Sequence, residues 1–321
     1  MMRAVVAKSG NDENPLAGLY IGEHPDPVVP DGWVRVAIKA AALNHHDVWT
    51  LRGVATAAEN LPIVLGSDAS GVLDDGREVI VHAVIGDPSN GDETLDPKRS
   101  LLSEVHNGTH AEYVTVPAYN VIDKPDFLSF EEAACLPTAW LTAYRMLFTK
   151  SGLQKGDTVL IQGAGGGVAT ALIQIAHAAG FITWVTSREE SKRDYAKSIG
   201  ADEVFESGAR LPGKVDAVME SVGEATWSHS MRSLRPGGRI VICGATSGAN
   251  PPADLNRLFF LQLEVVGSTM GTRAEFQALV KFMGETGLRP HVQKVVSLED
   301  AKIAYELMIS GDVLGKLVIV P

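Results

Sequence analysis

The sequence has little cysteine, no long apolar run and no excess of positive charge, and each absence excludes a class of protein. The two cysteines, Cys135 and Cys243, do not form a CxxC pair, which excludes a disulfide framework and a cysteine-rich structural zinc site. The net charge of −11 argues against a nucleic-acid surface, because phosphate backbones require clustered Lys and Arg. No run approaches the roughly 18 apolar residues of a membrane span, and the N-terminal stretch MMRAVVAKSG lacks the apolar core of a signal peptide. We therefore expect a cytoplasmic protein with no nucleic-acid or membrane partner.

The most informative stretch is a glycine-rich turn within residues 158–187. A short apolar run, 159–161, precedes the glycines, and apolar residues at helical spacing follow from Val168 before a second β-rich run at 181–186. This order of strand, turn, helix and strand predicts a dinucleotide site, because bare backbone N–H groups and the positive end of a helix can hold a pyrophosphate. The glycine pattern is imperfect, with alanine at both ends, but Gly166 keeps the position of close approach.

The residues after the second run indicate which nicotinamide cofactor is bound. An NAD site usually offers Asp or Glu to the ribose there, whereas Ser187 and Arg188 stand at this place, with Lys192 one turn further on. This pattern favours NADP(H), whose 2′-phosphate needs positive charge. The alternative is a solvated helix face, on which Glu189 and Glu190 partly cancel the basic residues.

The pattern of elements predicts an α/β protein with two parts. Up to about residue 120, short alternating strands separated by turn residues predict a β-rich, partly open barrel. Strands and helices then alternate, which predicts a parallel, doubly wound sheet with its ligand at the carboxyl ends of the strands. The last part, from about residue 266, has no partner in that sheet, and we expect it to return to the first part. The residues expected to contact the cofactor share a place at a predicted strand end or in the turn after it: Gly163, Gly165, Gly166, Gly167, Val168, Ser187, Arg188, Lys192, Val222, Gly244, Ala245, Thr246 and Ser268.

Several motifs together resemble the medium-chain dehydrogenase/reductase superfamily, which includes zinc-type alcohol dehydrogenases and quinone oxidoreductases. Besides the glycine turn, the matching stretches are 42–47, 61–68, 132–144, 235–239 and 315–317. The resemblance implies a Rossmann domain at 123–265 inserted into a GroES-like catalytic domain formed by 1–122 and 266–321. It also implies a homodimer built by edge pairing of the cofactor sheets, and a place for Lys316 at the cofactor.

The chain differs from the zinc-dependent members of this family at the positions of their metal ligands. The places of the three catalytic ligands, usually Cys, His and Cys, hold Asn44, Ser67 and Thr138, and amides and hydroxyls do not make the site that zinc favours. The region of the structural zinc, 83–107, contains no cysteine. We therefore expect no metal.

Without a metal, the expected reaction is hydride transfer between NADP(H) and a small apolar quinone, enone or enal, because a conjugated acceptor does not require a strong Lewis acid. We expect Asn44 to orient the substrate or nicotinamide, Asp47 to support Asn44, Thr138 to line the site, and His46 or His45 to donate a proton. A polar helix cap is the structural alternative for Asn44 and Asp47. Phe259 and Phe260 belong either to the wall of a substrate pocket or to the core.

Two other functions remain open at this stage. One is an alcohol dehydrogenase with an unorthodox zinc site, in which His45 or His46 acts with Asp68 and a water. The other is a non-catalytic NADPH-binding sensor, which would bind the cofactor without turning over any substrate.

Overall fold

The computed structural model describes residues 1–321, apart from the side chain of Asn90. The chain forms two compact units. The first contains residues 1–139, 270–285 and 289–321, and the second contains residues 140–269 and 286–288. Among the described residues, no helix combines the length and the apolar character needed to cross a lipid bilayer.

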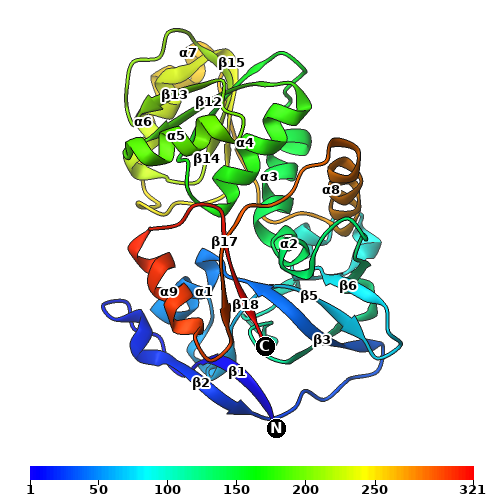
Figure 1. Cartoon of the computed structure of the whole chain (residues 1–321). Coiled ribbons are helices and arrows are strands. Elements are labelled where there is room, and N and C mark those ends of the chain that lie inside the picture. Colours follow the sequence, from blue (N-terminus) through cyan, green and yellow to red (C-terminus); the bar gives the residue numbers. More distant parts are fainter. The chain divides into compact units, whose positions relative to one another are not determined.

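The first unit is built on β-sheets. Its strands are β1 (Met2–Ala7), β2 (Leu19–His24), β3 (Trp33–Ala42), β4 (Ile63–Val64), β5 (Asp68–Leu73), β6 (Glu78–Val81), β7 (Val84–Ile85), β8 (Ser100–Leu101), β9 (Tyr113–Pro117), β10 (Val121–Asp123), β17 (Val292–Ser297) and β18 (Lys316–Val320). The largest sheet has the order β10-β6-β5-β3-β18-β17, with β9 also paired to β3. The chain end therefore returns to the first unit, as expected, because β18 pairs antiparallel with β3 (Figure 1).

Four α-helices complete the first unit: α1 (His45–Arg52), α2 (Phe130–Ala134), α8 (Arg273–Thr286, of which the last residue falls in the second unit) and α9 (Ala301–Ser310). Leu43, Val48 and Leu51 lie in one buried cluster with Tyr305 of α9 and Leu317 of β18. This apolar packing fixes the start of α1 beside the start of β18. Their polar neighbours are consequently held close together.

The second unit is a parallel sheet with α-helices. Its elements are β11 (Thr158–Gln162), α4 (Gly167–Ala179), β12 (Ile182–Ser187), α5 (Glu190–Ser198), β13 (Glu203–Glu206), β14 (Val215–Glu220), α6 (Glu224–Ser233), β15 (Leu234–Ile242), α7 (Leu255–Leu261) and β16 (Glu264–Gly267), preceded by the short helix α3 (Leu141–Tyr144). The order is β13-β12-β11-β14-β15-β16, with every pair parallel. Numbered along the chain, this is the order 3-2-1-4-5-6 of a Rossmann sheet, so the predicted α/β fold is confirmed.

The structure differs from the sequence analysis where the chain passes between the units. The sequence 129–132 resembles a helix cap, and the apolar spacing from Ala133 to Leu147 after it predicts one continuous helix. The cap is present, because α2 starts at Phe130 after a capping box of Ser129 and Glu132, but the helix changes to π-type turns at Leu136–Trp140 and Arg145–Lys150. Pro137 has no N–H to donate, which accounts for the first irregular turn. Because Ser70 donates to the Phe130 carbonyl at 2.6 Å, α2 packs on the first unit, whose first segment extends to Ala139.

Candidate functional site

A buried carboxylate holds the start of α1 in the first unit. Asp47 is fully buried, and its two oxygens accept the backbone N–H groups of Asn44 at 2.8 Å and of Gly66 at 2.9 Å. The acid therefore joins the start of the helix to the segment that leads into β5. The predicted support of Asn44 by Asp47 is thus a hydrogen bond to its backbone, while the Asn44 side chain is free to face other groups.

Asn44 and four other polar side chains form a closed hydrogen-bonded ring. The Lys316 ammonium donates to Asn44 Oδ1 at 2.6 Å and lies 3.4 Å from Asp68 Oδ2. Thr138 donates to Asp68 Oδ1 at 2.5 Å and lies 3.3 Å from Ser67 Oγ, which is 3.5 Å from Asn44 Nδ2. We call this set the polar ring; its members are Asn44, Ser67, Asp68, Thr138 and Lys316.

The polar ring contains a buried ion pair. The side chains of Lys316 and Asp68 are 2% and 0% exposed, so bulk water hydrates neither charged group. Burial raises the pKa of the Asp68 carboxyl, and the Lys316 ammonium opposes this rise. Such a pair is costly to disrupt from one side, because the remaining charge would be buried without a partner.

The two predicted histidines lie beside the polar ring in sequence but make other contacts. His45 is exposed at the first turn of α1. His46 is bound to Glu104, with its Nε2 2.9 Å from Oε1. Burial acts to lower the pKa of His46, but the hydrogen bond to Glu104 and nearby carboxylates raise it above its ordinary value. His46 therefore retains a proton to higher pH than a free imidazole.

The residues present do not fit a catalytic zinc ion. The three places of the family's metal ligands do come together, as Asn44, Ser67 and Thr138, but they supply an amide and two hydroxyls. An ammonium group already contacts the amide oxygen. Across the described part of the chain, no three His, Cys, Asp or Glu side chains gather closely enough to hold a metal ion. The alternative site, in which His45 or His46 acts with Asp68 and a water, has only two protein ligands and stays a prediction.

In the second unit, the glycine turn fits a dinucleotide. Gly163 follows β11 with φ of +90°, which only glycine adopts readily. Gly166 precedes α4 with φ of −69°, a conformation open to any residue, and a Cβ built on it meets no protein atom within 4 Å. Nothing within the protein therefore requires glycine at residue 166. The close approach of a ligand to the turn and to the start of α4 accounts for it.

The residues predicted to select NADP lie at the end of β12. Ser187 is the last residue of that strand and is buried, while Arg188 is exposed and its guanidinium has no acidic partner within 4 Å among the described residues. Lys192 forms an ion pair with Glu189 at 2.7 Å, so the partial cancellation of charge considered above does occur. Arg193 holds the turn itself, by donating to the carbonyls of Ser187 and Arg188.

The remaining predicted cofactor residues follow β14, β15 and β16 at the same edge of the sheet: Val222, Gly244, Ala245, Thr246 and Ser268. Gly223 next to them has φ of +90°. Lys316 is the exception, because it belongs to the first unit and its three hydrogen bonds lie there.

The sequence analysis did not identify Glu220, which lies at the same edge of the sheet. Glu220, the last residue of β14, is fully buried, and one of its oxygens accepts the N–H groups of Val222 and Gly223. Its carboxylate also accepts the hydroxyls of Thr226 and Ser230. Glu220 thus fixes the loop that carries Val222. An acid that ends an apolar strand was the signal available in the sequence.

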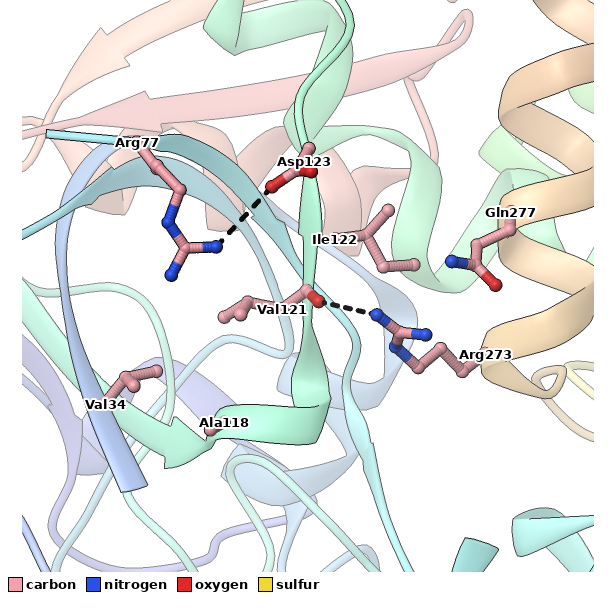
Figure 2. Close-up of a pocket in the computed structure, with 8 residues that line it drawn as sticks. All are labelled: Val34, Arg77, Ala118, Val121, Ile122, Asp123, Arg273 and Gln277. Carbon is pink, nitrogen blue, oxygen red and sulfur yellow. Dashed lines mark hydrogen bonds and ion pairs between the residues drawn. The ribbon is translucent and has the colours of Figure 1, made fainter. Parts of the chain in front are cut away.

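A surface hollow of about 370 Å³ lies elsewhere in the first unit (Figure 2). Figure 2 shows Arg77 and Arg273 entering it from different sides, the first facing Asp123 and the second donating to the Val121 carbonyl at 3.3 Å. Its wall includes Val34, near the start of β3, whereas Asn44 follows the end of that strand. None of the predicted site residues lines this hollow.

The aromatic pair of the second unit is not in the core. Phe259 and Phe260, on α7, are 62% and 77% exposed, and their ring centroids are 4.9 Å apart. This exposure contradicts a core position, and the place of the pair in a pocket wall stays a prediction.

Comparison with known proteins places these two units in one family. The alcohol dehydrogenase GroES-like domain model matches residues 30–126, and the zinc-binding dehydrogenase model matches residues 167–285. A solved structure of an NAD-dependent alcohol dehydrogenase is 36% identical, with a TM-score of 0.92 and full coverage of both chains.

Two further proteins are similar over nearly the whole chain. The acryloyl-coenzyme A reductase of Sulfurisphaera tokodaii is 28% identical, with full coverage of both chains. The structure of the 2-octenoyl-CoA carboxylase reductase CinF, solved with NADP and 2-octenoyl-CoA, is 26% identical, with a TM-score of 0.89 over 99% of this chain and 87% of that one. With its GroES-like and Rossmann units and a relative more than 30% identical over its full length, this chain belongs to the medium-chain dehydrogenase/reductase superfamily.

Proposed function

We propose that the chain is an NADP(H)-dependent reductase that transfers a hydride to a conjugated carbonyl compound without a metal. The acceptor classes are quinones, enones, enals and enoyl thioesters. The observation that carries the proposal is the combination of a glycine turn open to a dinucleotide with a catalytic position whose donors do not fit zinc. A conjugated acceptor takes hydride at its β-carbon without metal assistance, whereas alcohol oxidation ordinarily relies on it.

The cofactor of this proposal is NADP(H), which supplies the hydride when bound. Gly166 and the first N–H groups of α4 would face its pyrophosphate, and Ser187, Arg188 and Lys192 would surround the 2′-phosphate. The similar structure solved with NADP supports this choice. The 36% identical structure carries the name of an NAD-dependent enzyme, so the comparison of NADPH with NADH is a necessary measurement.

The residues of the first unit have proposed roles in binding and protonation. Asn44 and Thr138 would lie against the ligand, and Asp47 would hold Asn44 in place through its backbone. His46 is the proposed proton donor, because Glu104 helps it to retain a proton. The proton it gives up would complete the reduction at the α-carbon or at oxygen, while the hydride bonds to the β-carbon.

The names of two similar proteins narrow the acceptor to be tested first. One is an acryloyl-coenzyme A reductase, and the other was crystallised with 2-octenoyl-CoA. Acryloyl-CoA and crotonyl-CoA should therefore join menadione, crotonaldehyde and simple enones in the panel. The assay follows NADPH oxidation at 340 nm with protein that has been dialysed against EDTA. Turnover of a conjugated acceptor supports the proposal, and turnover of alcohols alone, with NAD⁺ and added zinc, would replace it with the alcohol dehydrogenase alternative.

The non-catalytic alternative has a distinct outcome in the same assay. A sensor would bind NADPH tightly and show no turnover with any member of the panel. The similarity to the NAD-dependent enzyme favours the alcohol dehydrogenase alternative. No particular contact in the structure favours the sensor alternative.

We further propose a homodimer formed through β16. This strand is one of the two edges of the sheet in the second unit, the other being β13, and Val265 on it is 44% exposed. Phe259 and Phe260 lie just before it and are more exposed still. An edge of this kind is a template for strand pairing across a two-fold axis. Light scattering should give twice the chain mass of 34.2 kDa, and Phe260→Glu should lower it. A monomer at micromolar concentration would refute the proposal.

A further inference from the structure

The polar ring has one hydrogen-bond direction, which its two charged members impose. An ammonium group can only donate, and a carboxylate can only accept. The Lys316 ammonium donates to Leu43 O at 2.9 Å, to Asn44 Oδ1 at 2.6 Å and to Asp68 Oδ2 at 3.4 Å. Since the amide oxygen of Asn44 must face the ammonium, its Nδ2 must face the other way, toward Ser67.

The hydroxyl groups of Ser67 and Thr138 continue the same order of donor and acceptor around the polar ring. Asn44 Nδ2 donates to Ala42 O at 3.4 Å and to Ser67 Oγ at 3.5 Å. Thr138 has a single hydroxyl proton, which goes to Asp68 Oδ1 at 2.5 Å. The contact of 3.3 Å between Ser67 and Thr138 can then run only from Ser67 to Thr138. Every polar hydrogen carried by these side chains is donated within the protein.

Thr138 is the most accessible member of the polar ring. It is half-buried, whereas the other four are at most 7% exposed. A hydroxyl oxygen has two lone pairs, and Ser67 uses one of those on Thr138. The ring therefore offers a ligand one lone pair and no hydrogen, so it presents a hydrogen-bond acceptor.

We propose that Asp68 is a positioning residue that holds the proton of Thr138 inward, and that Thr138 Oγ binds a hydroxyl group of the ligand. A carbonyl oxygen could bind there only if Thr138 turned away from Asp68. The loss of a hydrogen bond to a charged group disfavours that rotation by about tenfold or more. Identification of the hydroxyl with that of a reduced product, a hydroquinone or an enol, rests on the proposed function; the acceptor position itself does not.

A matched pair of ligands tests the proposal without any turnover. Cinnamyl alcohol and cinnamyl methyl ether differ in the hydroxyl proton, and their dissociation constants can be measured by calorimetry on the full chain saturated with NADPH. We expect the wild type to bind the alcohol about tenfold more tightly than the ether. Thr138→Val should reduce this preference to less than twofold, and Thr138→Ser should keep it.

The same ratio tests Asp68. Asp68→Ala removes the acceptor of the Thr138 proton, so Thr138 can turn this proton outward, and the preference should fall below twofold. Asp12→Ala, at an aspartate that is 78% exposed, is the matched control and should keep the preference. General damage to the fold would weaken both ligands together and leave their ratio unchanged.

Several outcomes would overturn the proposal. These are a wild type that does not prefer the alcohol, a preference that survives Thr138→Val, or one that survives Asp68→Ala in a folded protein. Should Asp68→Ala fail to fold, Lys316→Arg retains the charge and Ser67→Ala removes one link of the ring. Both should keep the preference, because the proton of Thr138 still goes to Asp68, and its loss in either would refute the assigned direction. A chain that reduces no acceptor would refute the proposed function and leave this binding test intact.

Discussion

Replacement of Asp47 by asparagine should destabilise the first unit far more than a surface change of the same kind. The Asp47 carboxylate accepts two buried backbone N–H groups, at 2.8 and 2.9 Å. An amide can accept only one of them and turns its own NH₂ toward the other. The orphaned donor costs about 1–3 kcal/mol, and the weakening of the remaining bond from charged to neutral adds about 1 kcal/mol. We therefore expect a loss of roughly 2–4 kcal/mol in the free energy of unfolding.

Thermal unfolding followed by circular dichroism measures this loss. For a domain of 150–250 residues, 1 kcal/mol corresponds to about 2–4 °C, so the midpoint should fall by roughly 5–15 °C. The matched control is Asp12→Asn, because Asp12 is 78% exposed and lies 3.9 Å from Arg52. That change should cost less than about 0.5 kcal/mol. If Asp47→Asn unfolds within a degree or two of the control, the carboxylate does not hold the start of α1 as described.

Three further results are expected. Since the pKa of His46 is raised in the folded chain, its bond to Glu104 stabilises the fold below the unfolded pKa near 6.5, and this contribution disappears as the pH rises through the folded value. His46→Gln should therefore lower the unfolding midpoint more at pH 5.5 than at pH 9 in denaturant titrations, and an equal effect at both would contradict this assignment. Burial raises the pKa of the Cys135 and Cys243 thiols to about 12, so iodoacetamide at pH 8 should alkylate the native chain about a thousandfold more slowly than a free thiol; rapid loss of both thiols would contradict it. Arg188→Ala should weaken NADPH binding about tenfold in a fluorescence titration and leave NADH unchanged, whereas equal losses would show that Arg188 does not read the 2′-phosphate.

The parallel sheet could be predicted well from the sequence because its signals are local. The glycine turn lies between β11 and α4 as expected. The helix expected from Ala133 to Leu147 could not be delimited in this way. Its apolar spacing continues through Pro137, but the missing N–H changes the backbone to π-type turns.

The candidate site was predicted as separate pieces rather than as an arrangement. Asn44, Asp47 and Thr138 were found by their motifs, and the structure brings Asn44 and Thr138 into one ring of hydrogen bonds. The place of Lys316 at the cofactor stays a prediction, but the sequence analysis did not predict that its ammonium donates a hydrogen bond to Asn44, 272 positions earlier in the chain. Local spacing carries no information on such a contact, because it depends on the pairing of β18 with β3. The roles of these residues in catalysis stay predictions.

The most direct test of the central claim is NADPH oxidation with crotonyl-CoA and menadione, measured on EDTA-treated protein whose zinc content is determined in the same preparation. The account predicts turnover with NADPH at less than about 0.1 zinc per chain, and much slower turnover with NADH. Stoichiometric zinc that survives chelation, together with activity lost when the zinc is removed, would contradict a metal-free reductase.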